Sequence, residues 1–518
     1  MLLEALSIKF FIKERQLLDI DRIQINKGDR IGLIGKNGTG KTTLLEVLAG
    51  KRTIDEGMIH QHATCELLPQ LKRSDTTKSG GEVTQEYIID ALTRNPEILL
   101  ADEPTTHLDT EHIEWLEKKL ANWQGALLLV SHDRTFLDAL CTSIWELDNG
   151  HVKEYKGNYS AYLKQKDLEI RSHEAAYEKY EKTKKQLEEA IVMKEKKAAR
   201  ATKTPKNVSS IEAKKSKPYF AKKQKKLQTV AKSIETRLEK LDKVEKMKES
   251  PAIRMALPNE EAFTGRTILR AHDVSGGFEN RVLWKKASFE VRGGDKLAII
   301  GVNGSGKTTI LKKIVNKESG ITLSPAVKYG YFSQTIDLLD TEKTILENVQ
   351  VSSNHTETFI RIVLARLHFF REDVYKEVNV LSGGERVKVA LAKLFVGDIN
   401  TLILDEPTNF LDIEAVEALE SLLVDYKGTI IFVSHDRRFI EKIATRILTI
   451  ENEELHVFEG TYDEYKNDEP RSRSDEEDNL LVLETKITEV LSRLSIEPTE
   501  ELEQEFQRLL AVKRKWLK

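Results

Sequence analysis

RIGLIGKNGTGKTTLL, residues 30–45, decides the fold of this chain, and it returns as KLAIIGVNGSGKTTIL at residues 296–311. Each copy indicates an apolar strand, a glycine-rich loop and the start of a helix. The loops fit the pattern G-x-x-x-x-G-K-T at 35–42 and 301–308. Glycines let consecutive backbone N–H groups wrap a phosphate, and the helix N-terminus favours an anion. The sequence therefore predicts two α/β domains, each with a phosphate-binding loop.

Three further blocks recur in the same order, which identifies a duplicated domain. They are PEILLADEPTTHLD (96–109) with INTLILDEPTNFLD (399–412), LLLVSHDRTFLDAL (127–140) with IIFVSHDRRFIEKI (430–443), and GNYSAYLK (157–164) with GTYDEYKN (460–467).

The spacing between the copies changes at one place. The pairs Lys41 and Lys307 and Gln70 and Gln334 lie 266 and 264 positions apart, but Ser79 and Ser382, Glu103 and Glu406, and His132 and His435 each lie 303 apart. The first copy therefore lacks about 39 residues that the second keeps. In the second copy this segment contains TFIRIVLARLHFF (358–370), whose apolar spacing is helical. We expect a small helical subdomain in the second copy and its loss from the first.

Carboxylates follow the buried strands LLAD and LILD. Asp102 and Asp405 stand where an acid could organise Mg²⁺, and Glu103 and Glu406 stand where a carboxylate could orient or deprotonate a water. His132 and His435 each follow an apolar strand, and Ser-Gly-Gly opens a helix in both copies. Alone, these residues would be strand-end caps, a core histidine and a helix cap. Their recurrence in order with a phosphate-binding loop favours an active site.

These motifs resemble those of the ATP-binding cassette family over nearly the whole chain. The matching pieces are Walker A (35–42, 301–308), the Q-loop Gln70 and Gln334, the signatures (79–82, 382–385), Walker B with its glutamate (102–103, 405–406), the D-loop Asp109 and Asp412, and the switch His132 and His435. The departures are Lys78 and Val83 around the first signature, and Phe410 where the first copy has His107.

The resemblance implies ATP and Mg²⁺ at two composite sites, because such cassettes pair head to tail. The expected catalytic residues are Glu103, Glu406, His132 and His435. The expected ATP-binding residues are Gly35, Asn37, Gly38, Gly40, Lys41, Thr42, Thr43, Gly301, Asn303, Gly304, Gly306, Lys307, Thr308, Thr309, Ser79, Gly81, Ser382 and Gly384. The expected Mg²⁺ ligands are Thr42, Gln70, Asp102, Thr308, Gln334 and Asp405. In this arrangement Lys41 faces Ser382 and Lys307 faces Ser79.

Between the cassettes, apolar residues repeat every seven positions from about 162 to 247, which favours an antiparallel helical pair. We expect a helix over 163–200, about 57 Å long at 1.5 Å per residue, with Pro205 and Pro218 bracketing the turn. The tip, 199–226, carries ten basic residues and one acidic one, although the whole chain has a net charge of −3. A lysine-rich solvated linker would explain the charge. Aromatics among the lysines favour RNA contact instead, through Lys203, Lys206, Lys214, Lys215, Lys217, Tyr219, Phe220, Lys222 and Lys223.

Two tandem cassettes with a basic helical linker resemble the ABC-F subfamily. Within it, SGGEVTQ (79–85), GNYS (157–160), KPYFAKKQKK (217–226) and LETKITEVLSRLSIEP (483–498) resemble the Vga-type antibiotic resistance proteins. This resemblance implies an ATPase that binds the bacterial 70S ribosome at the E site. Its tip would reach 23S rRNA near the peptidyl-transferase centre, beside P-site tRNA. It would counter lincosamides, pleuromutilins and streptogramin A compounds.

The predicted domains are a first cassette (1–157), a helical hairpin linker (158–258), a second cassette (259–467) and a short helical C-terminal extension (468–518). No run of about 18 apolar residues appears. The start MLLEALSIKFFIKERQLL is not expected to be a signal peptide, and Cys65 and Cys141 are the two cysteines of the sequence. Together with the resemblance to the ABC-F subfamily, these features lead us to expect a cytoplasmic, ribosome-associated monomer whose cassettes pair within one chain, with no membrane or DNA partner.

Three other classes of function remain open at this stage. The chain could energise a separate membrane drug exporter, although a basic hairpin would have no role there. It could serve DNA repair or chromosome structure, although the coils of such ATPases usually interrupt a single cassette. It could also bind ATP as a scaffold, which the two glutamates Glu103 and Glu406 disfavour.

Overall fold

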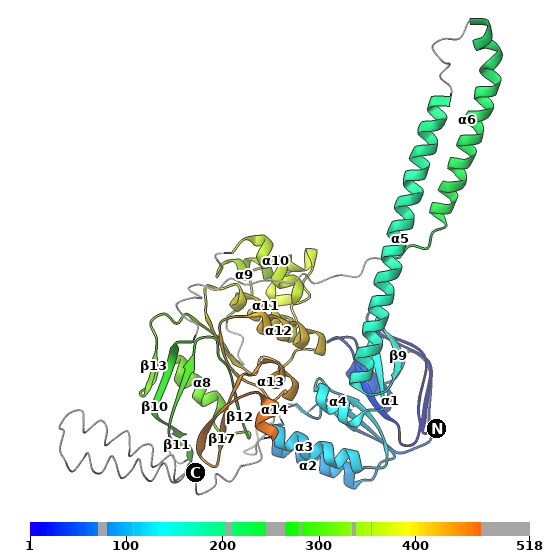
Figure 1. Ribbon diagram of the computed structural model, residues 1–518. Helices are drawn as coiled ribbons and strands as arrows, with labels where there is room; N and C mark the ends of the chain where they lie inside the picture. The colour runs from blue at the N-terminus through cyan, green and yellow to red at the C-terminus, as the bar shows by residue number, and fades with distance from the viewer. Residues whose placement is uncertain are drawn as a thin grey trace, which may run out of the picture.

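Two six-stranded, mostly parallel sheets organise the chain (Figure 1). The computed structural model describes residues 1–70, 80–106, 108–201, 210–244, 265–278, 281–333, 338–353 and 355–467 of the 518. The two large sheets have one topology, in the orders β5-β6-β7-β3-β8-β9 and β14-β15-β16-β12-β17-β18. The internal repeat therefore corresponds to two copies of one fold, as the sequence predicts.

In the first cassette the central strands are buried on both faces and apolar except for Asp102 at the end of one of them, as expected for a parallel sheet covered by helices. A three-stranded antiparallel sheet and α1 cover one face, and α2, α3 and α4 cover the other. The elements are β1 (Leu3–Ile12), β2 (Arg15–Ile25), β3 (Arg30–Ile34), α1 (Lys41–Leu48), β4 (Glu56–Gln61), β5 (Cys65–Leu68), α2 (Gly80–Thr93), β6 (Ile98–Asp102), α3 (Thr110–Asn122), β7 (Ala126–Val130), α4 (Arg134–Leu140), β8 (Ser143–Asp148) and β9 (His151–Lys156).

The second cassette repeats this arrangement. Its elements are β10 (Thr267–Phe278), β11 (Arg281–Arg292), β12 (Lys296–Gly301), α8 (Lys307–Val315), β13 (Ile321–Leu323), β14 (Tyr329–Phe332), α9 (Ile345–Gln350), α10 (Glu357–Arg366), the 3₁₀ turns η1 (Arg371–Tyr375) and η2 (Val378–Val380), α11 (Gly383–Phe395), β15 (Thr401–Asp405), α12 (Ile413–Asp425), β16 (Thr429–Val433), α13 (Arg437–Ile443), β17 (Arg446–Glu451), β18 (Glu454–Glu459) and α14 (Tyr462–Asn467).

The helical subdomain is present in the second cassette, where α9 and α10 pack on α11. In the first cassette the chain runs from β5 to α2 through only ten or so residues, and 71–79 lie outside the described part. The loss has a visible consequence on α2: Tyr87 is 53% exposed, whereas Ala390, its counterpart 303 positions on, is fully buried. This short connection is consistent with the predicted loss of the subdomain, which stays a prediction.

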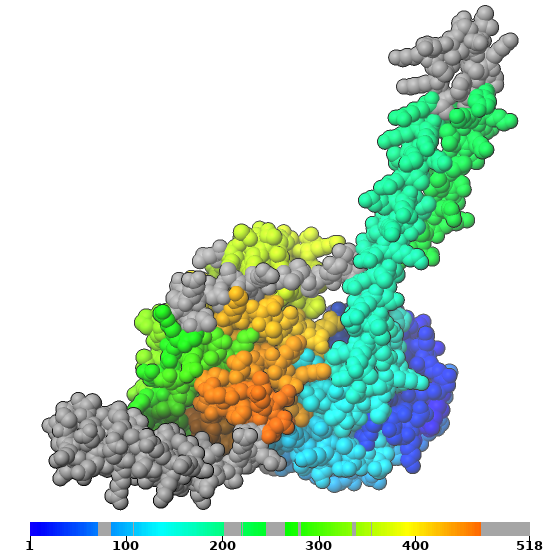
Figure 2. Space-filling model, viewed as in Figure 1, coloured from blue at the N-terminus to red at the C-terminus, as the bar shows by residue number. Residues whose placement is uncertain are grey.

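The linker forms a long hairpin of α5 (Tyr159–Ala201) and α6 (Ser210–Glu239), which stands away from the cassettes (Figures 1 and 2). The 43 residues of α5 span about 65 Å at 1.5 Å per residue. The predicted seam is confirmed, because the less exposed positions recur along both helices, and Ala198 and Ala231 are buried. One expectation is wrong: the backbone is already helical from Ser210, so Pro218 lies inside α6 and does not bound the turn. Pro205 lies outside the described residues.

Within the described ranges, no helix is long and apolar enough to cross a membrane. The predicted C-terminal extension, 468–518, and the stretch 245–264 before the second cassette lie outside the described residues.

Two candidate nucleotide sites between the cassettes

The first glycine-rich loop joins β3 to α1. Gly40, immediately before the helix, has φ 105°, and a Cβ there would lie 2.9 Å from Leu17 Cγ, so only glycine fits. No side chain caps the helix N-terminus. The ammonium group of Lys41 donates to the carbonyl oxygens of Gly35 (2.7 Å) and Lys36 (3.0 Å), which holds it within the loop. This is a cradle of N–H groups and one cation, suited to a phosphate chain.

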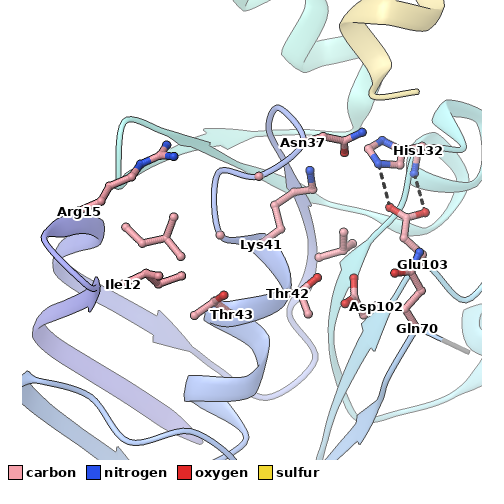
Figure 3. A pocket seen from close by; sticks show the side chains of 14 residues that line it. Ile12, Arg15, Asn37, Lys41, Thr42, Thr43, Gln70, Asp102, Glu103 and His132 are labelled. Atoms are coloured by element: carbon pink, nitrogen blue, oxygen red, sulfur yellow. Dashed lines mark hydrogen bonds and ion pairs between the residues drawn. The ribbon is translucent and has the colours of Figure 1, made fainter. Parts of the chain in front are cut away.

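A pocket of about 380 Å³ opens beside this loop (Figure 3). Ten of the residues predicted from the motifs line it: Asn37, Gly38, Gly40, Lys41, Thr42, Thr43, Gln70, Asp102, Glu103 and His132. Four more lining residues were not predicted: Ile12, Arg15, Leu17 and Val130. The first three belong to the strands β1 and β2, where no sequence motif distinguishes them.

The acidic residues lie at the carboxyl end of β6. Burial raises the pKa of Asp102, and a hydrogen bond from the Thr42 hydroxyl opposes this shift. One Asp102 oxygen, Oδ2, is buried with no hydrogen-bond partner. A hydroxyl beside a carboxylate with a free lone pair suits a hard cation such as Mg²⁺. In the described residues, no group of three or more His, Cys, Asp or Glu is placed to hold a metal ion, so phosphate oxygens and water would have to complete the cation's shell.

Glu103 and His132 lie next to each other on one side of the pocket (Figure 3). Glu103 adopts φ 51°, a left-handed conformation that is uncommon for a residue with a side chain. Its Oε2 accepts from the His132 backbone N–H at 3.2 Å, and His132 Nε2 lies 3.4 Å from Oε1. Strain of this kind recurs at functional sites, where surrounding structure imposes it.

The second site repeats this geometry. The Lys307 ammonium donates to the carbonyls of Gly301 (2.8 Å) and Val302 (3.0 Å), and the Thr308 hydroxyl donates to Asp405 Oδ1 at 3.1 Å. Glu406 also has a left-handed φ of 50°, and its Oε1 lies 3.3 Å from His435 Nε2.

Burial sets the charges of this second pair. It raises the pKa of Glu406 to about 7, although Lys307 opposes the shift. It lowers the pKa of His435 to about 3, and the Lys307 charge acts in the same direction. His435 is therefore neutral near pH 7, while Glu406 changes charge there.

The cassettes meet head to tail. The Asn37 backbone N–H donates to Asp412 Oδ2 at 3.1 Å, and its side-chain amide donates to the Phe410 carbonyl at 3.0 Å. In the reverse direction, the Asn303 backbone N–H donates to Asp109 Oδ2 at 2.8 Å. Each D-loop aspartate thus bonds to the phosphate-binding loop of the opposite cassette.

The second signature lies at the first site. Ser382 is the N-cap of α11, in a reciprocal capping box with Glu385. A Cβ on Gly384 would lie 3.4 Å from the Asn37 side-chain nitrogen of the opposite loop. Ser79, which would occupy the equivalent place at the second site, lies outside the described residues, as does Gln334. Gly81 lies in the first turn of α2.

The residues predicted to contact RNA lie far from these sites, toward the end of the hairpin (Figure 1). Lys214, Lys215, Lys217, Tyr219, Phe220, Lys222 and Lys223 are on α6, and Lys203 and Lys206 lie outside the described residues. Tyr219 is 67% exposed, and Lys222 and Lys223 are exposed as well.

Comparison with known proteins places this geometry in a family. A family model described as ABC transporter matches residues 18–74 and 284–409, and a second with the same description matches 145–255. The ribosome protection protein VmlR of Bacillus subtilis is 32% identical, over 94% of this chain and 92% of its own. The erythromycin resistance ATP-binding protein MsrA of Staphylococcus epidermidis is 32% identical, over 88% of this chain and 99% of its own.

Plant and structural relatives agree with this placement. ABC transporter F family member 5 of Arabidopsis thaliana is 33% identical over 80% of this chain and 57% of its own. Among solved structures, the RNase-L inhibitor superposes with a TM-score of 0.58 at 18% identity, over 88% of this chain and 90% of that one, which shows the shared fold. The chain belongs to the ABC-F family of ATP-binding cassette ATPases.

Proposed function

We propose that the chain binds the bacterial 70S ribosome and protects it from antibiotics that act at the peptidyl-transferase centre. The observation that carries the proposal is the hairpin: two long helices project from the ATPase body and end in lysine-rich sequence. A rod that presents positive charge at a distance suits a recessed anionic target such as rRNA, where phosphate contacts dominate affinity. The names of two relatives, a ribosome protection protein and an erythromycin resistance protein, support this assignment.

The ATP sites would supply the cycle. Lys41 and Lys307 would hold the β- and γ-phosphates, and Ser382 with Gly384 would close the first site from the opposite cassette. Thr42 with Asp102, and Thr308 with Asp405, would hold Mg²⁺ together with Gln70 and Gln334. When bound, Mg²⁺ would neutralise charge on the phosphates during transfer. ATP that contacts both cassettes binds the closed form better, and this differential affinity is what can shift the equilibrium toward closure.

Glu103 and Glu406 would orient or deprotonate the attacking water, and His132 and His435 would contact the γ-phosphate. Hydrolysis removes the contact that spans both cassettes, so it would release the closed form. We infer that closure accompanies binding at the ribosomal E site. There the tip, 199–226, would lie near 23S rRNA and P-site tRNA and disfavour lincosamides, pleuromutilins and streptogramin A compounds.

The test combines Glu103→Gln with Glu406→Gln, which should permit ATP binding and block hydrolysis. The variant is sedimented with 70S ribosomes through a sucrose gradient, with and without ATP. We expect co-migration only with ATP. Protein that stays at the top under both conditions would overturn the ribosomal assignment, and ATP-dependent recovery with membranes instead would favour an exporter subunit.

A second experiment isolates the tip. Shortening the chain within 201–219 should abolish protection in a translation assay containing lincosamide, while ATP binding stays at the parent level. Retained protection would show that the tip is dispensable.

Charge reversal of Lys214, Lys215 and Lys217 should flatten the salt dependence of ribosome binding, because fewer phosphate contacts release fewer counterions.

A further inference from the structure

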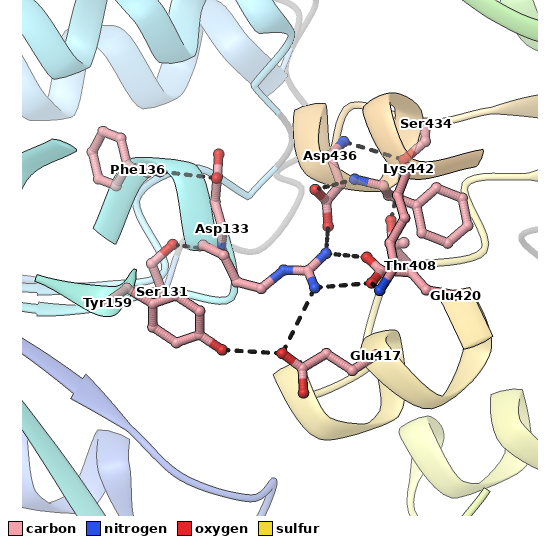
Figure 4. A network of polar contacts seen from close by, with 12 residues as sticks. Ser131, Asp133, Phe136, Tyr159, Thr408, Glu417, Glu420, Ser434, Asp436 and Lys442 are labelled. Atoms are coloured by element: carbon pink, nitrogen blue, oxygen red, sulfur yellow. Dashed lines mark hydrogen bonds and ion pairs between the residues drawn. The ribbon is translucent and has the colours of Figure 1, made fainter. Parts of the chain in front are cut away.

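An arginine follows each switch histidine by two positions and crosses between the cassettes. Arg134 begins α4 in the first cassette and is only 3% exposed. Its guanidinium forms a two-pronged ion pair with Glu420 of α12 in the second cassette, which includes an Nη1–Oε2 hydrogen bond of 3.1 Å. Nη2 also lies 3.5 Å from Asp436 Oδ2. Figure 4 shows Glu420 and Asp436 converging on this guanidinium.

The second cassette contains a counterpart that is less enclosed. Arg437 lies 303 positions after Arg134 and pairs with Glu117 at 2.9 Å and Glu114 at 3.8 Å, both on α3 of the first cassette. Their side chains are 27% and 39% exposed, whereas that of Glu420 is fully buried. Equivalent arginine–glutamate pairs therefore form in both directions between the cassettes. The Arg134–Glu420 pair is shielded from water (the dry contact), and the Arg437 pair is partly exposed to it.

The hairpin begins at the dry contact. Tyr159, the first residue of α5, donates its hydroxyl to Glu417 Oε1 at 3.4 Å, and Arg134 Nη1 lies 3.9 Å from the same oxygen. One turn further along α4, Asp138 accepts from the Ser160 backbone N–H (2.7 Å) and hydroxyl (2.8 Å). The short helix α4 thus contacts the switch loop, the opposite cassette and the base of the hairpin.

These contacts cross the interface and require the two cassettes to be together. Glu420 also pairs with Lys442 of its own cassette at 2.9 Å. Arg134 finds its strongest partner only across the interface, so the pair contributes to the closed form alone. A charge pair that is made in one state and lost in the other biases the equilibrium between them.

We propose that Arg134 is a positioning residue for ATP hydrolysis at the first site: by pairing with Glu420, it fixes the loop that carries His132, and with it the base of the hairpin, when the cassettes close. The proposal rests on the function assigned to the first site, and Arg134 itself does not reach the pocket. The pair thereby links the state of the ATP site to the direction of the hairpin.

The test compares Arg134→Met with the matched variant Arg437→Met in the full chain. Methionine keeps much of the apolar stem and removes the charge. We expect Arg134→Met to lower kcat by about tenfold or more, since breaking a buried pair is costly, and the loss should persist at saturating ATP even though weaker closure also raises KM for ATP. We expect Arg437→Met to lower kcat by about fivefold at most, since an ion pair whose carboxylates are partly exposed to water contributes less than a fully buried one. Equal losses in the two variants would overturn the proposal.

A double-mutant cycle separates positioning from damage to the fold. If Arg134 acts through Glu420, then Arg134→Met combined with Glu420→Gln should lose no more kcat than Arg134→Met alone. Additive losses would overturn the proposal. The ATPase assay contains no ribosomes, so its result is independent of the sedimentation experiment. If the parent protein hydrolyses ATP but does not bind ribosomes, the proposed function is refuted. If Arg134→Met leaves kcat unchanged, only this inference is refuted.

The proposed effect of Arg134 on the direction of the hairpin is measured separately, by energy transfer between two fluorophores. A fluorophore pair on Lys196 and on the exposed face of α10 reports the direction of the hairpin relative to the second cassette. ATP should change transfer efficiency in the Glu103→Gln/Glu406→Gln parent, and Arg134→Met should abolish that change while ATP remains bound. An undiminished ATP-dependent change in Arg134→Met would show that the hairpin moves by another route.

Discussion

Asp412, the N-cap of α12, caps its own helix and also accepts a hydrogen bond from the opposite cassette. One substitution can remove the second contact and keep the first. Asp412 Oδ1 accepts from the Ala415 backbone N–H at 3.0 Å and caps the helix, while Oδ2 accepts from the Asn37 N–H of the opposite cassette at 3.1 Å. Serine caps helices about as well as aspartate. Its shorter, neutral side chain cannot also span the interface. Asp412→Ser should therefore keep the cap and lose the contact between cassettes.

The magnitude follows from the kind of bond that is lost. A hydrogen bond to a charged group contributes about 1.5–3 kcal/mol. At about 1.4 kcal/mol per tenfold change, closure and the ATP affinity coupled to it should weaken roughly ten- to hundredfold. Asp412→Ala should show the same loss of affinity and also lose the cap, which contributes about 1 kcal/mol. For a domain of this size that cap corresponds to a fall in Tm of about 2–4 °C.

The assay is equilibrium binding of a fluorescent ATP analogue in the Glu103→Gln/Glu406→Gln background, with thermal unfolding measured without nucleotide. Asp109→Ser is the matched variant, since Asp109 Oδ2 accepts from Asn303 at 2.8 Å and Oδ1 caps α3. Unchanged ATP affinity in Asp412→Ser, together with a lowered Tm in Asp412→Ala, would refute the reasoning. It would mean that the contact seen between the cassettes adds nothing to closure.

Three further outcomes are expected. In Glu103→Gln, the first site is inactive and the ATPase rate reports the second site. This rate should fall about tenfold per pH unit below about 7, because burial raises the pKa of Glu406 to about 7 and the base acts when deprotonated. A flat pH–rate profile from pH 5.5 to 8 would contradict this. Gly306→Ala should destabilise the second cassette by about 1–3 kcal/mol from overpacking, because φ is 106° and the new Cβ would lie 2.4 Å from Trp284; urea unfolding measures it. Ala231→Arg should separate the hairpin helices and lower helicity by circular dichroism without changing ATP affinity, and unaltered helicity would argue against a packed seam.

The phosphate-binding loops, the strand-end acids and the duplicated fold could be predicted because each is encoded locally. Strand, glycine loop and helix follow one another within sixteen residues at 30–45, so backbone conformation and chemistry are specified together. The missing subdomain could also be predicted, because it changes the spacing between repeats. The domain boundaries and the roles of individual site residues stay predictions.

Contacts across the interface could not be predicted in the same way. Arg134 and Glu420 are 286 positions apart and belong to no motif that names them as partners. Ile12 and Arg15 reach the first pocket only because β1 and β2 fold over α1. Pro218 was misjudged because local propensity disfavours proline inside a helix by about 3 kcal/mol, whereas the packing of α6 along α5 continues the helix through it.

The repeat also explains why two sites with the same motifs differ. A tyrosine follows the last strand of each large sheet at equivalent positions: Tyr159 begins a helix of 43 residues, and Tyr462 begins one of six. On one side Tyr159 contacts Glu417 beside the fully buried Glu420, while on the other Arg437 has partly exposed partners. Charge pairs gain strength when water is excluded from them. The two halves therefore differ in the exposure of this ion pair, even though the residues that would carry out catalysis are the same in both halves.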